Sequence, residues 1–254
     1  MPLEPLSRIE PSERLVVLAR TIQSGGPATD DRSERDSKVG RYGETCLGRA
    51  LYRHRSVFQN AVGAPVWSHL ELIYFNGFVP AEVIHDLVFG PQPTDVSLLR
   101  AEILLTTPSA FVTPRNWQGA ARRPEWQASL EYINVQPACL REYRDIMRTY
   151  IGPAAERLVE AGEIGTFRAM ETAAVLYQDQ SLKIDWNQIH LCELDPNGFM
   201  GFGRAFDRVL STLFPGKSFV DVFAGLERLR SIPRWTFNDP LVEADIELSR
   251  LNRV

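Results

Sequence analysis

The segment Trp67–Leu72 (WSHLEL) returns later in the chain, slightly stretched, as Trp186–Leu194 (WNQIHLCEL). Both copies lie in strand-like runs, and each run is followed by a Gly-Phe pair and an apolar stretch suited to a helix. Such self-similarity indicates a chain built from two copies of one structural unit. It also places two histidines, His69 and His190, at related positions of the two copies.

Composition sets the broad class. The chain has 254 residues, 44% hydrophobic and 24% charged, which is typical of a soluble globular protein with a sizeable core. The net charge of −4 argues against nucleic-acid binding, which needs excess Lys and Arg. No apolar run approaches the roughly 20 residues of a membrane span. There is no signal-peptide pattern, and the three widely spaced cysteines fit reduced thiols, so we expect a cytoplasmic protein.

Apolar periodicity predicts the secondary structure. In the first half it indicates strands at 15–22, 67–75 and 96–106, and helices at 46–62 and 80–89. In the second half it indicates strands at 130–136, 166–177, 185–194 and 242–251, and helices at 140–161, 198–214 and 219–229. The pair Gly152-Pro153 should kink or split the first of these helices.

The second half therefore reads β-α-β-β-α-β with one extra helix, which is the ferredoxin-like order. The first half fits the same order if a weak strand lies between Cys46 and Pro65. We predict an α+β fold of two fused ferredoxin-like repeats, with a first half at 12–107, a linker at 108–127 and a second half at 128–254. The polar, Gly-rich stretch 24–43 is expected to be a mobile loop, either a disordered insertion or a lid over a site.

The stretch LEYINVQPACLREYRDIMRTYIGPAAERL (130–158), with the strand pair and helix that follow it, resembles the dimeric α+β barrel superfamily. That superfamily includes the NIPSNAP-like, EthD-like and antibiotic-biosynthesis-monooxygenase-like families. The resemblance covers about residues 128–254, and the acidic stretch after Thr21 departs from the compact family pattern. It implies an α+β barrel with a ligand cavity, located either between the subunits of a homodimer or between fused repeats.

Strand alternation suggests where chemistry is located, because side chains on a strand point to opposite faces in turn. The mixed polar face of the first repeated strand carries Trp67, His69 and Glu71, and that of the second carries Trp186, Gln188 and His190. We expect both faces to line a shared hollow inside the barrel. Two more side chains from the strand at 130–136 are expected to join them: Tyr132 and Asn134.

Histidine titrates near neutrality, so His190 and His69 are predicted to transfer protons, with Glu71 orienting His69. The tryptophans, with Gln188, Tyr132 and Asn134, would bind a flat apolar ligand. Structural alternatives stay open: a strand histidine often bonds a backbone carbonyl, and buried tryptophans often fill a core.

Several motifs are absent. The chain has no Gly-rich dinucleotide or Walker loop, no Gly-x-Ser-x-Gly elbow and no His-Glu-x-x-His helix, which disfavours nucleotide-dependent enzymes, serine hydrolases and zincins. It also has no Cys-x-x-Cys or closely spaced His pair for a metal site.

Three functions remain. The first is a small-molecule enzyme without a nucleotide cofactor: an acid/base isomerase, cyclase, lyase or cofactor-free oxygenase of secondary metabolism, acting on an aromatic or polyketide-like compound. The second is a non-catalytic binding barrel. The third is a haem-dependent barrel enzyme, with His190 or His69 as axial ligand. A buried titratable group beside the cavity favours an enzyme over a binding protein.

Overall fold

The computed structural model describes residues 6–8, 14–25, 42, 45–63, 67–92, 94–114, 125–195, 197 and 199–244. Its strands are β1 (Leu6–Arg8), β2 (Val16–Ser24), β3 (Cys46–Asn60), β4 (His69–Phe75), β5 (Val96–Pro114), β6 (Gln127–Val135), β7 (Thr166–Gln178), β8 (Gln188–Leu194) and β9 (Arg230–Ala244). Its helices are α2 (Ala81–Ile84), α3 (Leu140–Ile146), α4 (Gly152–Glu160), α5 (Phe199–Leu213) and α6 (Phe219–Leu229). Single π-helical turns, His85–Phe89 and Met147–Ile151, follow α2 and α3, and a 3-10 turn, Pro137–Cys139, precedes α3.

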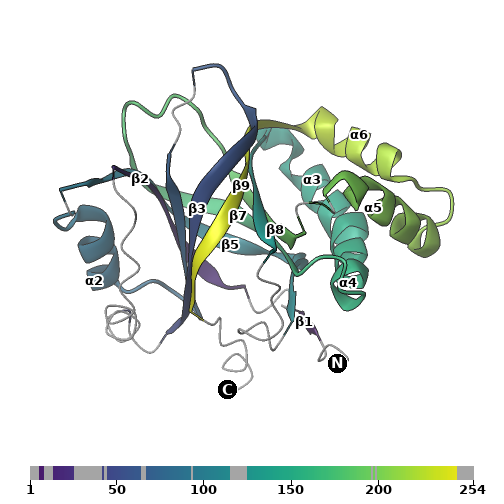
Figure 1. The fold of residues 1–254 in the computed structure, drawn as a ribbon, viewed down its shortest axis with the longest axis horizontal. Helices are drawn as coiled ribbons and strands as arrows, with labels where there is room; N and C mark the ends of the chain where they lie inside the picture. The colour runs from purple at the N-terminus through teal and green to yellow at the C-terminus, as the bar shows by residue number, and fades with distance from the viewer. Residues whose placement is uncertain are drawn as a thin grey trace.

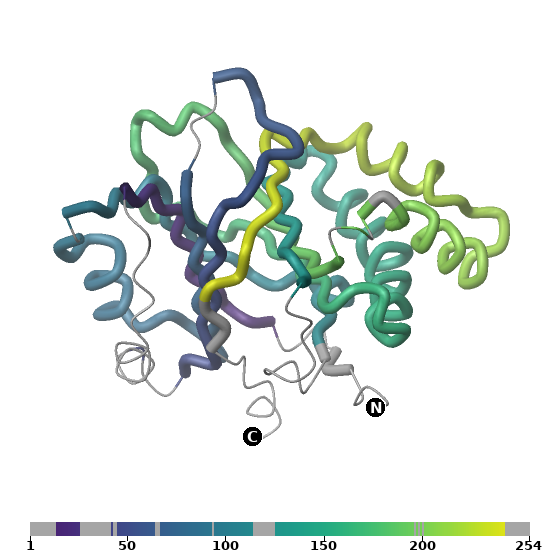
Figure 2. Tube along the Cα trace, in the orientation of Figure 1, coloured from purple at the N-terminus to yellow at the C-terminus, as the bar shows by residue number. Residues whose placement is uncertain are grey.

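Each half has the strand order of a ferredoxin-like repeat. The order is β5-β2-β4-β3 in the first half and β9-β6-β8-β7 in the second. The edges of the two sheets join, because β3 pairs with β9 and β5 pairs with β7. Figure 2 shows the first of these junctions, where the yellow tube of β9 runs beside the blue tube of β3. The predicted α+β barrel of two fused repeats is confirmed, and it closes within one chain.

One predicted element was wrong, and the start of another was misplaced. The helix expected at 46–62 is strand β3, because Ala50 and Tyr52 point into the core at the two-residue spacing of a strand. This is the weak strand that the ferredoxin-like order required. The last strand begins at Arg230 rather than at 242, because its inward-facing residues are polar and hid the alternation. Residues 245–254, most of the expected strand at 242–251, lie outside the described residues.

The long helix of the second half is split where predicted. Pro153 has no N–H for a helical hydrogen bond, and the π-helical turn ends just before Gly152. Gly152 is required here, because a Cβ at this position would lie 1.8 Å from the Ser109 carbonyl oxygen of β5. Most of the loop expected at 24–43, and residues 115–124 of the expected linker, lie outside the described residues, whereas β5 itself continues to Pro114.

The two faces of the sheet have different cores. Large apolar and aromatic side chains from both halves fill the barrel interior. Helices α3 to α6 cover the outer face of the second half, and α2 lies against the first half on the opposite side (Figure 1). Among the described residues, none of the helices combines the length and the apolar composition needed to cross a lipid bilayer.

Candidate functional site

Three of the predicted site residues meet in the barrel interior. The rings of Trp67, Tyr132 and Trp186 lie with centroids 4.8, 5.1 and 5.5 Å apart, and Trp67 Nε1 donates to the Tyr132 hydroxyl at 3.2 Å. Arg234 stacks on Trp67 at 3.7 Å and Arg100 on Trp186 at 4.1 Å. These rings fill space with each other and with two guanidinium groups, so they form a packed core.

The two histidines do not share a hollow. On β4 the interior takes Leu70 and Leu72, which leaves His69 and Glu71 on the outer face of the first half. On β8 the interior takes Ile189 and Leu191, so the other two predicted residues, His190 and Gln188, lie on the outer face of the second half. The expected face assignment was reversed. Both strands are buried on both faces, so no contrast between buried and exposed positions marks the inner side.

Asn134 contributes to neither assembly. It is half-buried near the end of β6, where a register irregularity separates it from Tyr132 and pairs it with Ser231 of β9.

In the first half, Glu71 is held by arginines and not by His69. Arg20 Nη1 donates to Oε2 at 2.5 Å, and Arg49 Nε donates to Oε1. Burial acts to raise the pKa of Glu71, but the two guanidinium groups lower it to about 2. His69 Nδ1 hydrogen-bonds the Ser68 hydroxyl at 2.8 Å, and burial, with Arg53, lowers the pKa of His69. This arrangement fixes a permanent anion beside a neutral imidazole.

The second half contains a cavity of about 320 Å³ between the outer sheet face and the covering helices. Its walls are mainly aromatic, formed by Phe167, Phe199, Phe202, Phe206, Phe219, Phe223 and Trp235. The polar groups that line it are Ser129, Glu131, His190, Cys192, Glu227 and Arg230. A largely apolar pocket with a few convergent polar groups is the usual form of a small-molecule site.

Strand register places the polar groups of the floor side by side. His190 of β8 lies directly opposite Glu131 of β6, which in turn lies opposite Trp235 of β9. Side chains opposite each other in neighbouring antiparallel strands have Cβ atoms about 4.5–5.5 Å apart. The imidazole and the carboxyl group are therefore neighbours on one sheet face, although 59 positions separate them in the sequence.

A chain of hydrogen bonds through Tyr143 of helix α3 connects Arg230 to His190. Arg230 Nη1 donates to the Tyr143 hydroxyl at 3.4 Å, and that hydroxyl lies 3.3 Å from His190 Nε2. Burial raises the pKa of Tyr143 to about 12, although Arg230 opposes the rise, so the phenol keeps its proton near neutral pH. When the phenol donates to Nε2, the proton of the neutral imidazole lies on Nδ1, and when the phenol accepts, it lies on Nε2.

The pKa values at the cavity move in opposite directions. Burial, reinforced by Arg230, lowers the pKa of His190 well below its ordinary value, so the ring is neutral near pH 7. Burial raises the pKa of Glu131, although Arg230, 3.6 Å away, opposes the rise. Burial also raises the pKa of Cys192, which keeps it a thiol. The cavity therefore holds a neutral imidazole beside a carboxyl group that exchanges its proton nearer neutrality than an exposed glutamate does.

The sequence pattern did not predict Glu131, Tyr143 or Arg230 as site residues. Alternation in LEYINVQ does carry a signal for Glu131, but the reversed face assignment selected its neighbour Tyr132 instead. Tyr143 lies on α3 and Arg230 begins β9, and no spacing in the sequence connects either residue to His190.

A haem in this cavity would take His190 as its axial ligand. An axial histidine must direct a ring nitrogen towards the iron, and His190 is the single imidazole among the lining residues. Its Nε2 is occupied by the Tyr143 hydroxyl. Within the described ranges there is also no cluster of three or more His, Cys, Asp or Glu side chains for a metal ion.

Comparisons with known proteins identify the fold. No protein-family model and no curated protein matches the chain. The crystal structure of an anthrone oxidase-like protein superposes with a TM-score of 0.54 at 9% identity, covering 96% of this chain and 98% of the other. A candidate monooxygenase from Fusobacterium nucleatum gives 0.50 at 11% identity, covering 91% and 94%. At such identities the likeness shows a shared ferredoxin-like α+β barrel fold.

Proposed function

We propose that this chain is a small-molecule enzyme that performs acid–base chemistry in the helix-covered cavity of its second half. One observation carries the proposal. His190 and Glu131 lie side by side on the floor of an aromatic-walled cavity, with pKa values displaced in opposite directions. Such pairs are characteristic of sites that transfer protons.

The walls indicate the class of substrate. Seven aromatic side chains surround the cavity, and aromatic rings pack best against flat apolar surfaces. Five of the six polar lining residues named above lie on the sheet strands and the sixth, Glu227, lies on α6, so the ligand should carry one oxygen-bearing edge towards the sheet and an extended apolar body. An aromatic or polyketide-like compound has this form, and the name of the anthrone oxidase-like neighbour refers to a compound of the same class.

The polar groups of the site have different roles in the proposed reaction. His190, with its proton on Nδ1, donates to a carbonyl or phenol oxygen and stabilises the charge that develops there. Glu131 removes a proton from the adjacent carbon and returns it later. Tyr143 and Arg230 do not act on the substrate; they fix the imidazole tautomer and the position of the carboxylate. Isomerisation, cyclisation and elimination share this step, and a cofactor-free oxygenation would begin with it and then add dioxygen.

A non-catalytic binding barrel is the alternative. Binding alone does not require a buried imidazole and a buried carboxyl group beside the ligand, so these two groups favour the enzyme. The site roles predicted for His69, Glu71, Trp67, Trp186, Gln188, Tyr132 and Asn134 stay predictions, and none of these residues lines the cavity. The narrower NIPSNAP or EthD kinship, a homodimer and a cytoplasmic location also stay predictions.

The proposal is tested by catalysed hydrogen–deuterium exchange. 2-Tetralone is a flat aromatic ketone with acidic C–H bonds, and NMR in D₂O follows their exchange. We expect the protein to accelerate exchange, and both His190→Gln and Glu131→Gln to remove about 99% or more of the acceleration.

Gln188→Ala is the matched control. Gln188 is two residues before His190 on β8 and lies on the same sheet face, but it does not line the cavity. Exchange that persists unchanged in both cavity variants would refute proton transfer at this site.

A further inference from the structure

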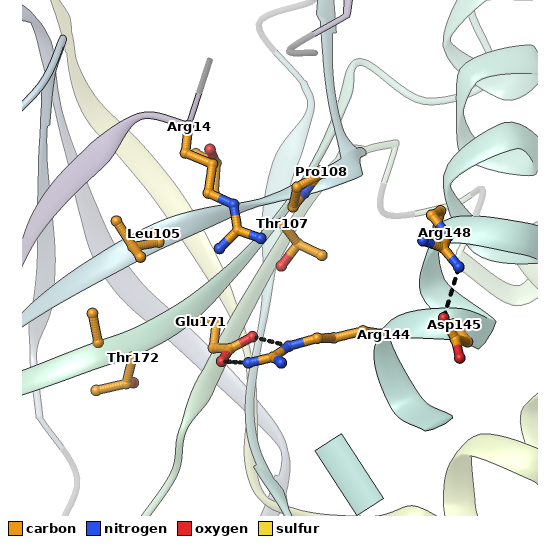
Figure 3. Close-up of a pocket in the computed structure, with 11 residues that line it drawn as sticks. Arg14, Leu105, Thr107, Pro108, Arg144, Asp145, Arg148, Glu171 and Thr172 are labelled. Carbon is orange, nitrogen blue, oxygen red and sulfur yellow. Dashed lines mark hydrogen bonds and ion pairs between the residues drawn. The ribbon is translucent and has the colours of Figure 1, made fainter. Parts of the chain in front are cut away.

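A second, smaller hollow of about 140 Å³ lies between β5, β7 and the end of helix α3 (Figure 3). Its lining holds no aromatic side chain among the described residues, and it includes the polar side chains of Arg14, Thr107, Arg144, Arg148 and Glu171. The π-helical turn after α3 separates the two spaces: its Arg148 faces this hollow, while its Met147 and Ile151 line the aromatic cavity.

A bulge in β5 creates the hollow. Thr106 pairs with Met170 of β7, but the next paired residue is Phe111, opposite Arg168, so residues 107–110 stand against one residue of the partner strand. Ser109 adopts a positive φ of 63°, and its carbonyl oxygen packs against Gly152. Backbone contact therefore fixes the bulge, and bulges of this kind are used to re-aim side chains beside functional sites.

In the described ranges of the chain, two donors in the hollow have no protein partner: Thr107, which is buried, and Arg14, which is exposed. Thr107 is 8% exposed, and its Oγ1 has no hydrogen-bond partner. Within the described part of the chain, the guanidinium group of Arg14 makes no hydrogen bond or ion pair, and Figure 3 shows it beside Thr107. A buried hydroxyl without a partner is unfavourable, so its presence next to a free guanidinium indicates a place for an acceptor.

The other side of the hollow supplies further donors. Arg144 binds Glu171 through Nε at 2.8 Å and through Nη2, and Arg148 donates to Asp145 at 2.8 Å. A guanidinium has five N–H groups, so both arginines keep donors to spare. Three guanidinium groups face two carboxylates, which leaves one positive charge, that of Arg14, uncompensated.

We propose that this hollow binds a phosphate group, either free or at the end of a small metabolite. Guanidinium and hydroxyl donors from three directions match the several acceptor oxygens of a phosphate. The volume admits the group itself and excludes a large organic ligand. The site is separate from the aromatic cavity, so the inference goes beyond the proposed function and does not depend on it.

Isothermal titration and ³¹P NMR with inorganic phosphate, methyl phosphate and acetate test the inference. We expect saturable binding of both phosphates, a dissociation constant below about 5 mM, and weaker binding of acetate. Arg14→Ala and Thr107→Val should each weaken phosphate binding about fivefold to tenfold. Neither change removes an internal hydrogen bond, so both variants should keep the wild-type circular dichroism spectrum and melting temperature.

Arg157→Ala is the matched control for Arg14→Ala: it removes one exposed arginine that does not line the hollow and changes the net charge equally. Equal affinity in the wild-type protein and in the Arg14 and Thr107 variants would overturn the site, as would the absence of saturation. Acetate binding as tight as phosphate would overturn the ligand class. Binding of inorganic phosphate without methyl phosphate would identify the free ion as the ligand.

Discussion

Strands β4 and β8 occupy the same place in the two repeats, and each carries a histidine on its outer face near a glutamate. In the first half, Glu71 follows His69 on the same strand, and two arginines lower its pKa to about 2. In the second half, Glu131 lies across from His190 on β6, and burial raises its pKa because its one arginine is 3.6 Å away.

The comparison shows that position in a fold does not determine protonation. Charge interactions weaken with distance and with exposure to water, so the number and closeness of the arginines decide whether a buried carboxyl group is a fixed anion or a proton carrier. The first half uses its glutamate to join strands β2, β3 and β4. The second half keeps its glutamate available beside a cavity.

The sharpest test of this contrast replaces each histidine in turn with glutamine. His190→Gln should lower the rate of 2-tetralone exchange about 100-fold to 10,000-fold, because it removes a group that acts at the reacting atoms. His69→Gln should leave the rate within about threefold of the wild-type rate, since His69 does not line the cavity. NMR rate measurements on the two variants and the wild-type protein check this prediction. A larger loss for His69 would reverse the assignment.

Replacing the two glutamates should affect the stability of the protein to different extents. Glu71→Gln removes the buried carboxylate that binds Arg20 and Arg49, so the free energy of unfolding should fall by about 3–5 kcal/mol. Glu131→Gln replaces a carboxyl group that burial already disfavours as an anion, and we expect a change within about 1 kcal/mol. Urea unfolding followed by circular dichroism measures both values. Equal losses would mean that the two carboxyl groups contribute equally to the free energy of unfolding, which would contradict the contrast.

Sequence patterns predicted most of this fold because the second half is strongly periodic. The apolar stripe of 140–161, the Gly152-Pro153 break and the repeated strands each reflect local physics that requires no partner. The sequence predicted a helix in place of strand β3 because the exposed part of the strand, RHRSVF, has no apolar alternation. Pairing with β4 and β9 makes this segment a strand.

The site was only partly predictable. His190 was found because its strand repeats that of His69, and the aromatic helix 198–214 was found from its stripe. The face on which His190 lies depends on which layer covers each side of the sheet, and a strand buried on both sides carries no such information. Tyr143 and Arg230 reach His190 only through tertiary packing.

Acid should destabilise the protein through Glu71. The folded pKa is about 2, against an ordinary value of 4.5, so the anion contributes stability above pH 4.5 that is lost as the pH falls towards 2. At about 1.36 kcal/mol per pH unit, the loss is on the order of 3 kcal/mol. Urea titrations between pH 2 and pH 6 should show this acid slope in the wild-type protein and a shallower slope in Glu71→Gln. Identical slopes would assign the acid sensitivity to other carboxyl groups.

The smallest expected effect comes from removing the hydrogen bond between Tyr143 and His190. Tyr143→Phe removes only the hydroxyl that joins Arg230 to His190 Nε2, and we expect the rate of 2-tetralone exchange to fall about tenfold through kcat, with KM little changed. The ¹⁵N shifts of His190 should change from a single Nδ1–H form to a mixture of tautomers. Tyr150→Phe is the control, since its ring packs on Phe214 of the same helical layer and lines neither hollow. A loss of rate without a change in the tautomer would mean that Tyr143 supports the packing of the cavity and does not orient the imidazole.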